Sequence, residues 1–149
     1  MKKFARIIGT GSYLPPKVVT NFDLEKTLDT SDEWITARTG IKERRIVTDQ
    51  NTCDLALEAS IKALSMAKLK PEEIDLIILS TTTPDKIFPA TATMLQNRLG
   101  ASCPAFDLQA VCAGFVFALT TAQQYIENGS AKNILVVGSE TMSKIVDWS

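Results

Sequence analysis

The chain has 149 residues, 45% of them hydrophobic, which is enough to bury the core of one globular unit. Its 16 Lys and Arg residues against 17 Asp and Glu residues give a net charge of −1, so no global field favours a nucleic acid or an anionic membrane as partner. There is no histidine, and the three cysteines form no CxxC pair, which argues against a metal site of the usual zinc ligands.

The first residues contain too few apolar side chains before Arg6 and Gly9 to form the apolar core of a signal peptide. No run approaches the roughly 18 apolar residues that a membrane span requires. An odd number of cysteines without a secretion signal fits a reducing compartment. We therefore expect a cytoplasmic protein.

Short apolar runs alternate with longer helical patterns, which is typical of an α/β fold with a largely parallel sheet. The first strand is expected over residues 5–9. The segment after it contains Gly9 and Gly11 but then two prolines, whereas a dinucleotide-binding fingerprint needs a third glycine and a helix. The pattern therefore argues against a Rossmann-type site.

Two short helices are expected next, the first over residues 21–28 and the second beginning at Thr30. Thr30 would be the N-cap, and Glu33 three residues later would complete a capping box. A turn at Gly40 then leads into an exposed hairpin over residues 40–46. A longer helix follows from its cap Asn51 through residue 68, and its alanines indicate close packing on a sheet.

The remaining chain predicts three strands and two helices in alternation. Residues 74–80 form a continuous apolar run, as in a strand covered on both faces. A helix is bracketed by Pro89 and Gly100. A strand around Phe106, a helix from Cys112 to Gly129 and a strand over residues 133–139 complete the pattern.

Cys112 is the candidate nucleophile. It lies where the Phe106 strand gives way to a helix, and small residues flank it on both sides. Backbone N–H groups and the helix dipole at such a place favour thiolate over thiol, and the amide of Cys112 itself could hold the oxygen of a tetrahedral intermediate. A buried, inert thiol is the alternative, and it is the interpretation we give to Cys53 and Cys103.

Trp34 and Arg38 lie four residues apart, on one face of the predicted second helix. An indole can stack on a purine and a guanidinium can hold a phosphate, so this pair could clasp a flat, phosphorylated ligand. The alternative is a Trp that anchors its helix in the core, with Arg38 in solvent. The nearby basic residues Lys42, Arg44 and Arg45 are interpreted as a charged hairpin edge.

Several motifs occur in register along the chain: residues 9–15 (GTGSYLP), 30–35 (TSDEWI), 38–44 (RTGIKER), 103–107 (CPAFD) and 110–115 (AVCAGF). Together they resemble the β-ketoacyl-[acyl-carrier-protein] synthase III family over all 149 residues. The resemblance implies a thiolase-like, layered α/β/α fold with a mixed, mostly parallel sheet. It also implies that residues 1–149 are the first of two pseudo-symmetric halves, ending before the last strand of that half.

The resemblance further implies an acyltransferase that starts type II fatty-acid synthesis by condensing acetyl-CoA with malonyl-[acyl-carrier protein] to give acetoacetyl-[acyl-carrier protein]. Cys112 matches the family's nucleophile, Trp34 the residue that stacks on the CoA adenine, and Thr30 and Arg38 its neighbours at the nucleotide. Phe88 matches the residue that reaches across a homodimer into the partner's acyl pocket. No cofactor is implied, because acetyl-CoA is a substrate.

The family's second half supplies a His and an Asn for decarboxylation, and nothing in this chain matches them. We therefore expect the chain alone to be inactive in condensation. We also expect it to be poorly stable, because the family's strand order in each half is 3-2-4-5-1 and the fifth strand lies beyond residue 149. Dimerisation is expected through the edge strand near Phe106. The alternatives are another thiolase-fold condensing enzyme that uses acyl-CoA, or a non-catalytic fragment that only dimerises or binds CoA.

Overall fold

The computed structural model describes residues 4–148, and the chain folds as two compact units rather than the single unit that composition predicts. Unit 1 contains residues 4–13 and Asn51–Glu140, and unit 2 contains Leu14–Gln50 and residues 141–148. The division arises because each unit builds its own sheet, with three strands in unit 1 and two in unit 2 among the described residues.

The sheet of unit 1 is parallel, with β3 (Leu76–Ser80) between β4 (Ala105–Leu108) and β5 (Ile134–Gly138). Every residue of β3 is buried, as its continuous apolar run predicts. In the expected strand order 3-2-4-5-1, β4, β3 and β5 correspond to strands 3, 2 and 4. The fold is therefore the thiolase-like α/β fold that the resemblance implies.

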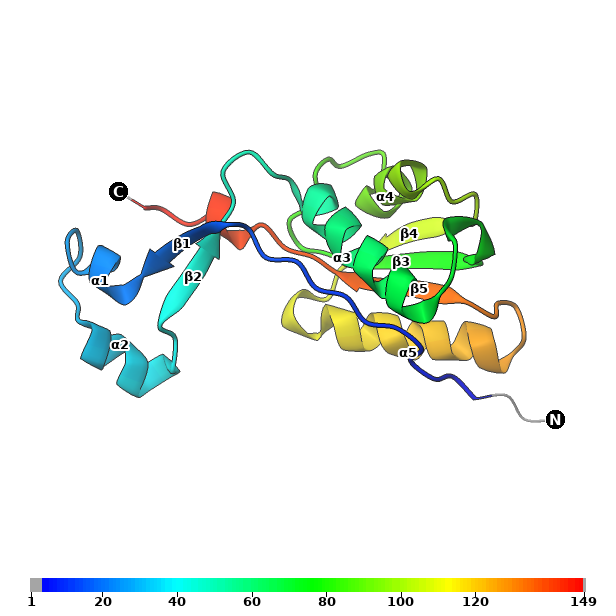
Figure 1. Ribbon diagram of the computed structural model, residues 1–149, viewed down its shortest axis with the longest axis horizontal. Coiled ribbons are helices and arrows are strands. Elements are labelled where there is room, and N and C mark those ends of the chain that lie inside the picture. Colours follow the sequence, from blue (N-terminus) through cyan, green and yellow to red (C-terminus); the bar gives the residue numbers. More distant parts are fainter. Residues whose placement is uncertain (1–3, 149) are drawn as a thin grey trace. The chain divides into compact units, whose positions relative to one another are not determined.

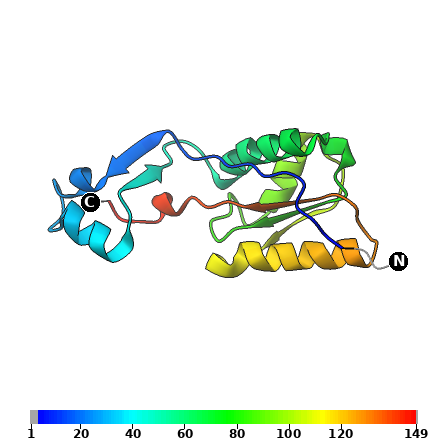
Figure 2. The same ribbon diagram turned by 60° about the horizontal axis from the view of Figure 1, so that its bottom comes forward.

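Helices cover both faces of this sheet (Figures 1 and 2). Side chains alternate along a strand, so Ile77 and Leu79 point to one face, where α3 (Thr52–Ala67) and α4 (Thr91–Leu99) pack. Leu76 and Ile78 point to the other face, where α5 (Gly114–Glu127) supplies Ala118 and Ala122. Two apolar cores thus separate three layers.

Residues 5–9 do not form the predicted strand, because they pair with no other strand in the described part of the chain. They instead run beside α3, where Gly9 and Gly11 approach the helix backbone. A Cβ at Gly9 would lie 2.4 Å from the Ala63 carbonyl oxygen, and one at Gly11 would lie 2.2 Å from that of Ala59. The small residues of α3 therefore accommodate this segment as well as the sheet.

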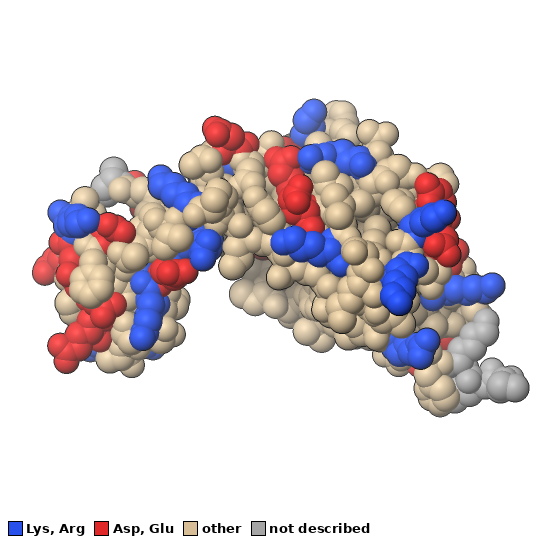
Figure 3. Space-filling view, viewed as in Figure 1, with Lys and Arg blue, Asp and Glu red and all other residues tan. Residues whose placement is uncertain are grey.

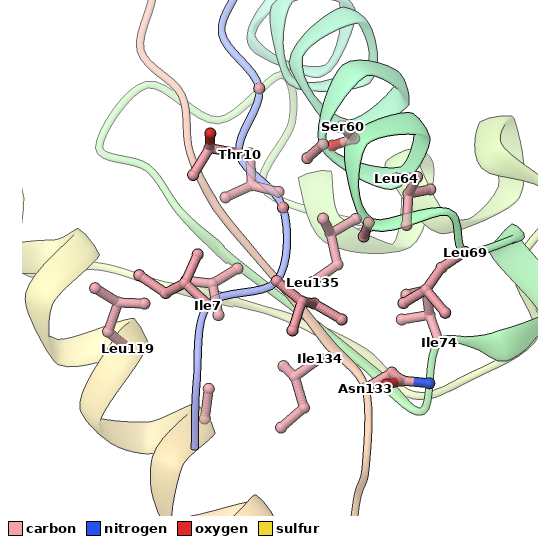
Figure 4. A pocket seen from close by; sticks show the side chains of 18 of the residues that line it. Ile7, Thr10, Ser60, Leu64, Leu69, Ile74, Leu119, Asn133, Ile134 and Leu135 are labelled. Carbon is pink, nitrogen blue, oxygen red and sulfur yellow. The ribbon is translucent and has the colours of Figure 1, made fainter.

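A hollow of about 740 Å³ separates residues 5–11 from β5 (Figure 4). Its walls are mainly apolar and come from the N-terminal segment, α3, α5 and β5, including Ile7, Leu64, Leu119, Ile134 and Leu135. On this side β5 pairs with no strand among residues 4–148. Two stretches of backbone thus face each other across a space with no strand between them.

Unit 2 is built on an antiparallel pair, β1 (Lys17–Thr20) with β2 (Glu43–Ile46). The hairpin predicted within residues 40–46 is therefore wrong, because this segment pairs with a strand that precedes the two helices. Those helices are α1 (Asn21–Leu24), shorter than predicted, and α2 (Asp32–Thr39). Short 3₁₀ turns complete the chain: Pro71–Glu73 and Val111–Ala113 in unit 1, and Met142–Lys144 in unit 2.

The N-cap of α2 is Ser31 and not Thr30. The Ser31 hydroxyl accepts a hydrogen bond from the Trp34 backbone N–H at 3.0 Å, and Ser31 has the extended backbone of a cap, with φ −144°. Thr30 precedes the cap, and its N–H donates to the Leu28 carbonyl. Thr30 and Ser31 are adjacent and both have the hydroxyl of a typical N-cap, so the sequence alone does not distinguish them. In the structure the helix begins directly after Ser31.

Candidate active site

Cys112 lies in the 3₁₀ turn Val111–Ala113 that connects β4 to α5, and it is exposed to solvent. This turn is close to the carboxyl end of the parallel sheet, because the α5 residue Gly114 contacts Ser80, the last residue of β3. Ligands of open α/β sheets bind outside the carboxyl ends of the strands. The structure therefore places an accessible thiol in a position suited to catalysis.

Val111, which precedes the thiol, has a left-handed backbone with φ +48°. A β-branched residue rarely adopts this conformation, which costs about 1–2 kcal/mol for an L-residue. Such strain persists only where packing enforces it, and it concentrates at functional sites. The backbone at Val111, directly before Cys112, is thus held in a conformation that a β-branched residue does not favour.

Gly114 shows what enforces this turn. A Cβ at Gly114 would lie 2.0 Å from Ser80 Oγ and 3.3 Å from Ser80 Cβ, so only glycine permits the start of α5 to pack this closely on β3. At Gly138, the last residue of β5, the contact is looser: Phe115 of α5 lies 3.2 Å from the position of a Cβ. The first turn of α5 is therefore fixed against two strands.

The other two cysteines are buried, as predicted. Cys53 is 1% exposed and Cys103 is 8% exposed, and both belong to the core between α3, α4 and the sheet. Burial raises the pKa of both thiols. They are core residues, and their raised pKa values disfavour the reactive thiolate.

The loop between β3 and α4 carries Phe88 and is tied down at both ends. At its start the Glu140 carboxylate accepts hydrogen bonds from the backbone N–H groups of Thr82 (2.8 Å) and Thr83 (3.1 Å). At its end the Asp107 carboxylate accepts from Thr91 N (2.8 Å) and Ala92 N (2.7 Å) and so caps α4.

Between these ties Phe88 is 82% exposed, beside an even more exposed Ile87. Two adjacent large apolar side chains in solvent on an anchored loop are typical of a surface that meets a partner. The role that the family resemblance gives to Phe88, in the acyl pocket of a second copy, stays a prediction.

In unit 2, Trp34 and Arg38 lie together on α2. The Arg38 guanidinium carbon is 4.3 Å from the centroid of the Trp34 ring, and its Nη1 donates to the Trp34 carbonyl at 3.4 Å. Trp34 is 52% exposed, so the alternative of a Trp anchored in the core is wrong. We call this pair the Trp34–Arg38 clasp.

The predicted site residues fall into two groups. Cys112 and Phe88 belong to unit 1, and Thr30, Trp34 and Arg38 belong to unit 2. The basic residues near the clasp are only partly a solvated edge, because Arg44 donates to Asn21 Oδ1 in the interior of unit 2. Sequence reasoning missed Asn21 and Glu140, since only the folded chain brings their partners to them.

The charged side chains of both signs are interspersed on the face drawn in Figure 3. Within residues 4–148 no group of three or more Cys, Asp or Glu side chains could hold a metal ion. The same residues include no helix with the length and apolar content of a membrane span.

Comparison with known proteins extends the resemblance. Residues 106–149 match the family model of 3-oxoacyl-[acyl-carrier-protein] synthase III. Over 149 residues the chain is 67% identical to a β-ketoacyl-[acyl-carrier-protein] synthase III of Vesicomyosocius okutanii, covering 100% of this chain and 48% of that protein. It is 60% identical to one of Neisseria gonorrhoeae, covering 99% of this chain and 47% of that protein. The chain therefore spans about half the length of these relatives.

Solved structures agree with the sequence matches. The 3-oxoacyl-[acyl-carrier-protein] synthase III of Aquifex aeolicus superposes with a TM-score of 0.93 at 54% identity, covering 100% of this chain and 48% of that one. The priming β-ketosynthase of the R1128 polyketide pathway superposes with a TM-score of 0.94 at 38% identity, covering 98% of this chain and 44% of that one.

Proposed function

This chain belongs to the β-ketoacyl-[acyl-carrier-protein] synthase III family, and we propose that the protein of which it forms about half primes fatty-acid synthesis. It takes an acetyl group from acetyl-CoA onto Cys112 and condenses it with malonyl-[acyl-carrier protein]. The product is acetoacetyl-[acyl-carrier protein]. Acetyl-CoA is a substrate in this scheme, and no cofactor takes part.

The first step is nucleophilic catalysis. The Cys112 thiolate attacks the thioester carbonyl of acetyl-CoA, a new C–S bond forms, and CoA leaves as its thiol after taking up a proton. In the second step malonyl-[acyl-carrier protein] loses CO₂, and the resulting carbanion attacks the acetyl carbonyl and releases the Cys112 thiolate. The backbone N–H of Cys112 is our candidate donor to the oxygen of the tetrahedral intermediates.

The observation that carries this proposal is the exposed thiol on a strained turn at the start of α5. The other cysteines are buried in the core, so Cys112 alone among the three combines access with a position near the strand ends. The Trp34–Arg38 clasp supports acetyl-CoA as donor, because it offers an exposed ring face for a purine and a guanidinium for a phosphate.

The proposal is tested with the full-length protein. Incubation with acetyl-CoA should add one acetyl group, and peptide mapping should place it on Cys112. Addition of malonyl-[acyl-carrier protein] should then release CO₂ and form acetoacetyl-[acyl-carrier protein]. Cys112→Ser should abolish both steps, while Cys103→Ser should retain them. An acetyl group on another residue, or no adduct, would contradict the proposal.

A priming ketosynthase of polyketide synthesis is the second candidate, because one such enzyme superposes with a TM-score of 0.94. The two functions differ in the acyl group accepted. A panel of acyl-CoAs of increasing chain length, read by the mass of the Cys112 adduct, separates them: preference for acetyl-CoA supports fatty-acid initiation, and preference for longer acyl groups supports the second candidate.

We also propose that the 149-residue chain does not condense by itself. It contains no histidine, so the His that the family uses for decarboxylation cannot come from these residues. The remaining role for the 149-residue chain would be to dimerise or to bind CoA. Condensation by the purified 149-residue chain would contradict this proposal.

The homodimer that we propose for the whole protein uses the outer edge of β4 and the exposed Phe88. β4 is an edge strand among the described residues, and such an edge offers unpaired N–H and C=O groups to a second copy. A cytoplasmic location and an acyl carrier protein as partner belong to the same proposal.

A further inference from the structure

Asn21 is the first residue of α1 and is completely buried, with 0% exposure. A buried amide side chain is costly unless its polar atoms are bonded. Its Nδ2 donates to Asp32 Oδ1 at 2.8 Å, to Thr36 Oγ1 at 3.3 Å and to the Ile41 carbonyl at 2.7 Å. Asn21 therefore meets both turns of α2 and the chain just beyond its end.

The oxygen of the Asn21 amide and the backbone N–H of Asn21 are hydrogen-bonded as well. Asn21 Oδ1 accepts from Arg44 Nη1 on β2, and its backbone N–H donates to the Lys42 carbonyl at 3.2 Å. One side chain thus connects α2, which carries the clasp, to the strand pair of unit 2.

Helix α2 has little apolar packing to hold it. It spans eight residues, Asp32–Thr39, and Ile35 is its single buried residue. A helix this short is not stable from its own hydrogen bonds and depends on packing. Because only one apolar side chain anchors α2, its position depends on polar contacts. These are the hydrogen bonds that Asn21 makes at Asp32 and Thr36, and the one that the Asp32 backbone N–H donates to Glu25.

We propose that Asn21 is a positioning residue for the Trp34–Arg38 clasp, acting through Asp32 and Thr36. This inference rests on the proposed function and adds to it a determinant of CoA recognition that does not touch the substrate. Trp34 lies between Asp32 and Thr36 in sequence, and Arg38 follows them on the same helix. A shift of α2 therefore moves the ring and the guanidinium together.

Asn21→Asp tests the inference in the full-length protein. The substitution keeps the shape and an oxygen acceptor for Arg44. It removes the amide donors and sets a carboxylate against Asp32, so the contact between positions 21 and 32 becomes repulsive. The rate constant for Cys112 acylation is measured with acetyl-CoA and with the acetyl thioester of N-acetylcysteamine, which lacks the nucleotide. We expect a loss of about tenfold with acetyl-CoA and a change of less than about twofold with the short thioester.

Comparing the two acyl donors distinguishes a shift of the clasp from a general loss of folding or of Cys112 reactivity. Equal losses with both donors, or no loss with acetyl-CoA, would overturn the inference. Asn97→Asp is the control, since Asn97 is an exposed residue of α4 and undergoes the same change of charge. It should leave both rate constants unchanged.

Thr36→Val keeps the test decisive if Asn21→Asp does not fold. It removes the hydroxyl that accepts from Asn21 and donates to Asp32, without adding a charge. We expect a selective loss of about threefold with acetyl-CoA, and an equal loss with both donors would overturn the inference. If wild-type Cys112 is not acetylated by acetyl-CoA, the proposed function itself fails, which is a different outcome.

Discussion

At the scale of single residues, the three cysteines differ in access to solvent. Cys112 is exposed, whereas burial raises the pKa of Cys53 and Cys103 and reduces their thiolate fraction. We predict that iodoacetamide at pH 7 alkylates Cys112 at least about tenfold faster than either buried thiol. Mass spectrometry of digested samples taken over time measures the three rates. Urea should equalise them, and faster labelling of Cys53 in the folded chain would contradict the assignment.

Asp75 gives a prediction about pH. Its carboxylate accepts from the backbone N–H groups of Lys132 (2.7 Å) and Asn133 (2.9 Å), and these bonds hold its pKa below the ordinary value. A lowered pKa stabilises the fold above the unfolded-state pKa of about 3.9, and this contribution is lost as the pH falls through the folded-state pKa.

Asp75→Asn should therefore lower the free energy of unfolding by about 1 kcal/mol at pH 7, a modest value because the residue is exposed. Urea unfolding at several pH values should show the difference from wild type shrinking below about pH 4. The control is Glu58→Gln, an exposed position in the same unit, which should show no such dependence. A difference that grows in acid would contradict the assignment.

At the scale of elements, the contact between α5 and β3 sets the turn that carries the thiol. Gly114→Ala would place a methyl group 2.0 Å from Ser80 Oγ, so the start of α5 must move. We predict a loss of about tenfold in Cys112 acylation by acetyl-CoA in the full-length protein, because the thiol moves with the turn. Alanine is more favourable than glycine in a helix by about 1 kcal/mol, so the substitution alone would not weaken α5. A lower acylation rate would therefore result from the clash with Ser80.

A second substitution provides the control. Ser80→Ala removes Oγ and leaves Ser80 Cβ, at 3.3 Å, as the atom of that side chain nearest to the new methyl group. The double variant Gly114→Ala, Ser80→Ala should therefore recover most of the lost rate, and Ser80→Ala alone should behave as wild type. A double variant no faster than Gly114→Ala would show that this contact does not control the turn.

Elements with strong internal patterns were predictable. Helix α3 follows its cap Asn51 as expected, α4 ends at Gly100 in the left-handed conformation, and the three parallel strands coincide with the apolar runs. Residues 5–9 have the composition of a strand but lack a neighbour to pair with, and pairing is a property that no local pattern contains. The hairpin predicted within residues 40–46 is wrong for the same reason, because residues 43–46 pair with the distant residues 17–20.

The site was predictable to a similar degree. The position of Cys112 between a strand and a helix, and the spacing of Trp34 and Arg38, are local features. The exposure of Trp34 was not, because the burial of a side chain depends on the whole unit. Asn21 and Glu140 were missed because their partners lie between 11 and 59 residues away in sequence.

At the scale of the whole molecule, the hollow beside β5 bears on stability. We propose that it receives a strand from outside these 149 residues of the longer protein, since backbone faces it on two sides. Apolar side chains at the start of α5 add to the uncovered surface, with Val116 64% and Phe117 56% exposed. Both features favour association of the isolated chain.

We predict that the 149-residue chain has a lower Tm than the full-length protein and aggregates at micromolar concentration. Calorimetry and light scattering measure the two properties. Ile87→Ser in the isolated chain serves as control, because it removes an exposed apolar side chain outside the hollow and should not cure aggregation. A monomeric fragment with the Tm of the full-length protein would contradict the prediction.

The left-handed backbone of Val111 has a consequence for attempts to improve the protein. A residue that tolerates positive φ would relieve the unfavourable conformation, but it would also loosen the segment that aims the sulfur. Heat resistance and turnover are therefore opposed at this one position. Engineering for durability should spare Val111 and look for its gains in parts of the molecule remote from the thiol.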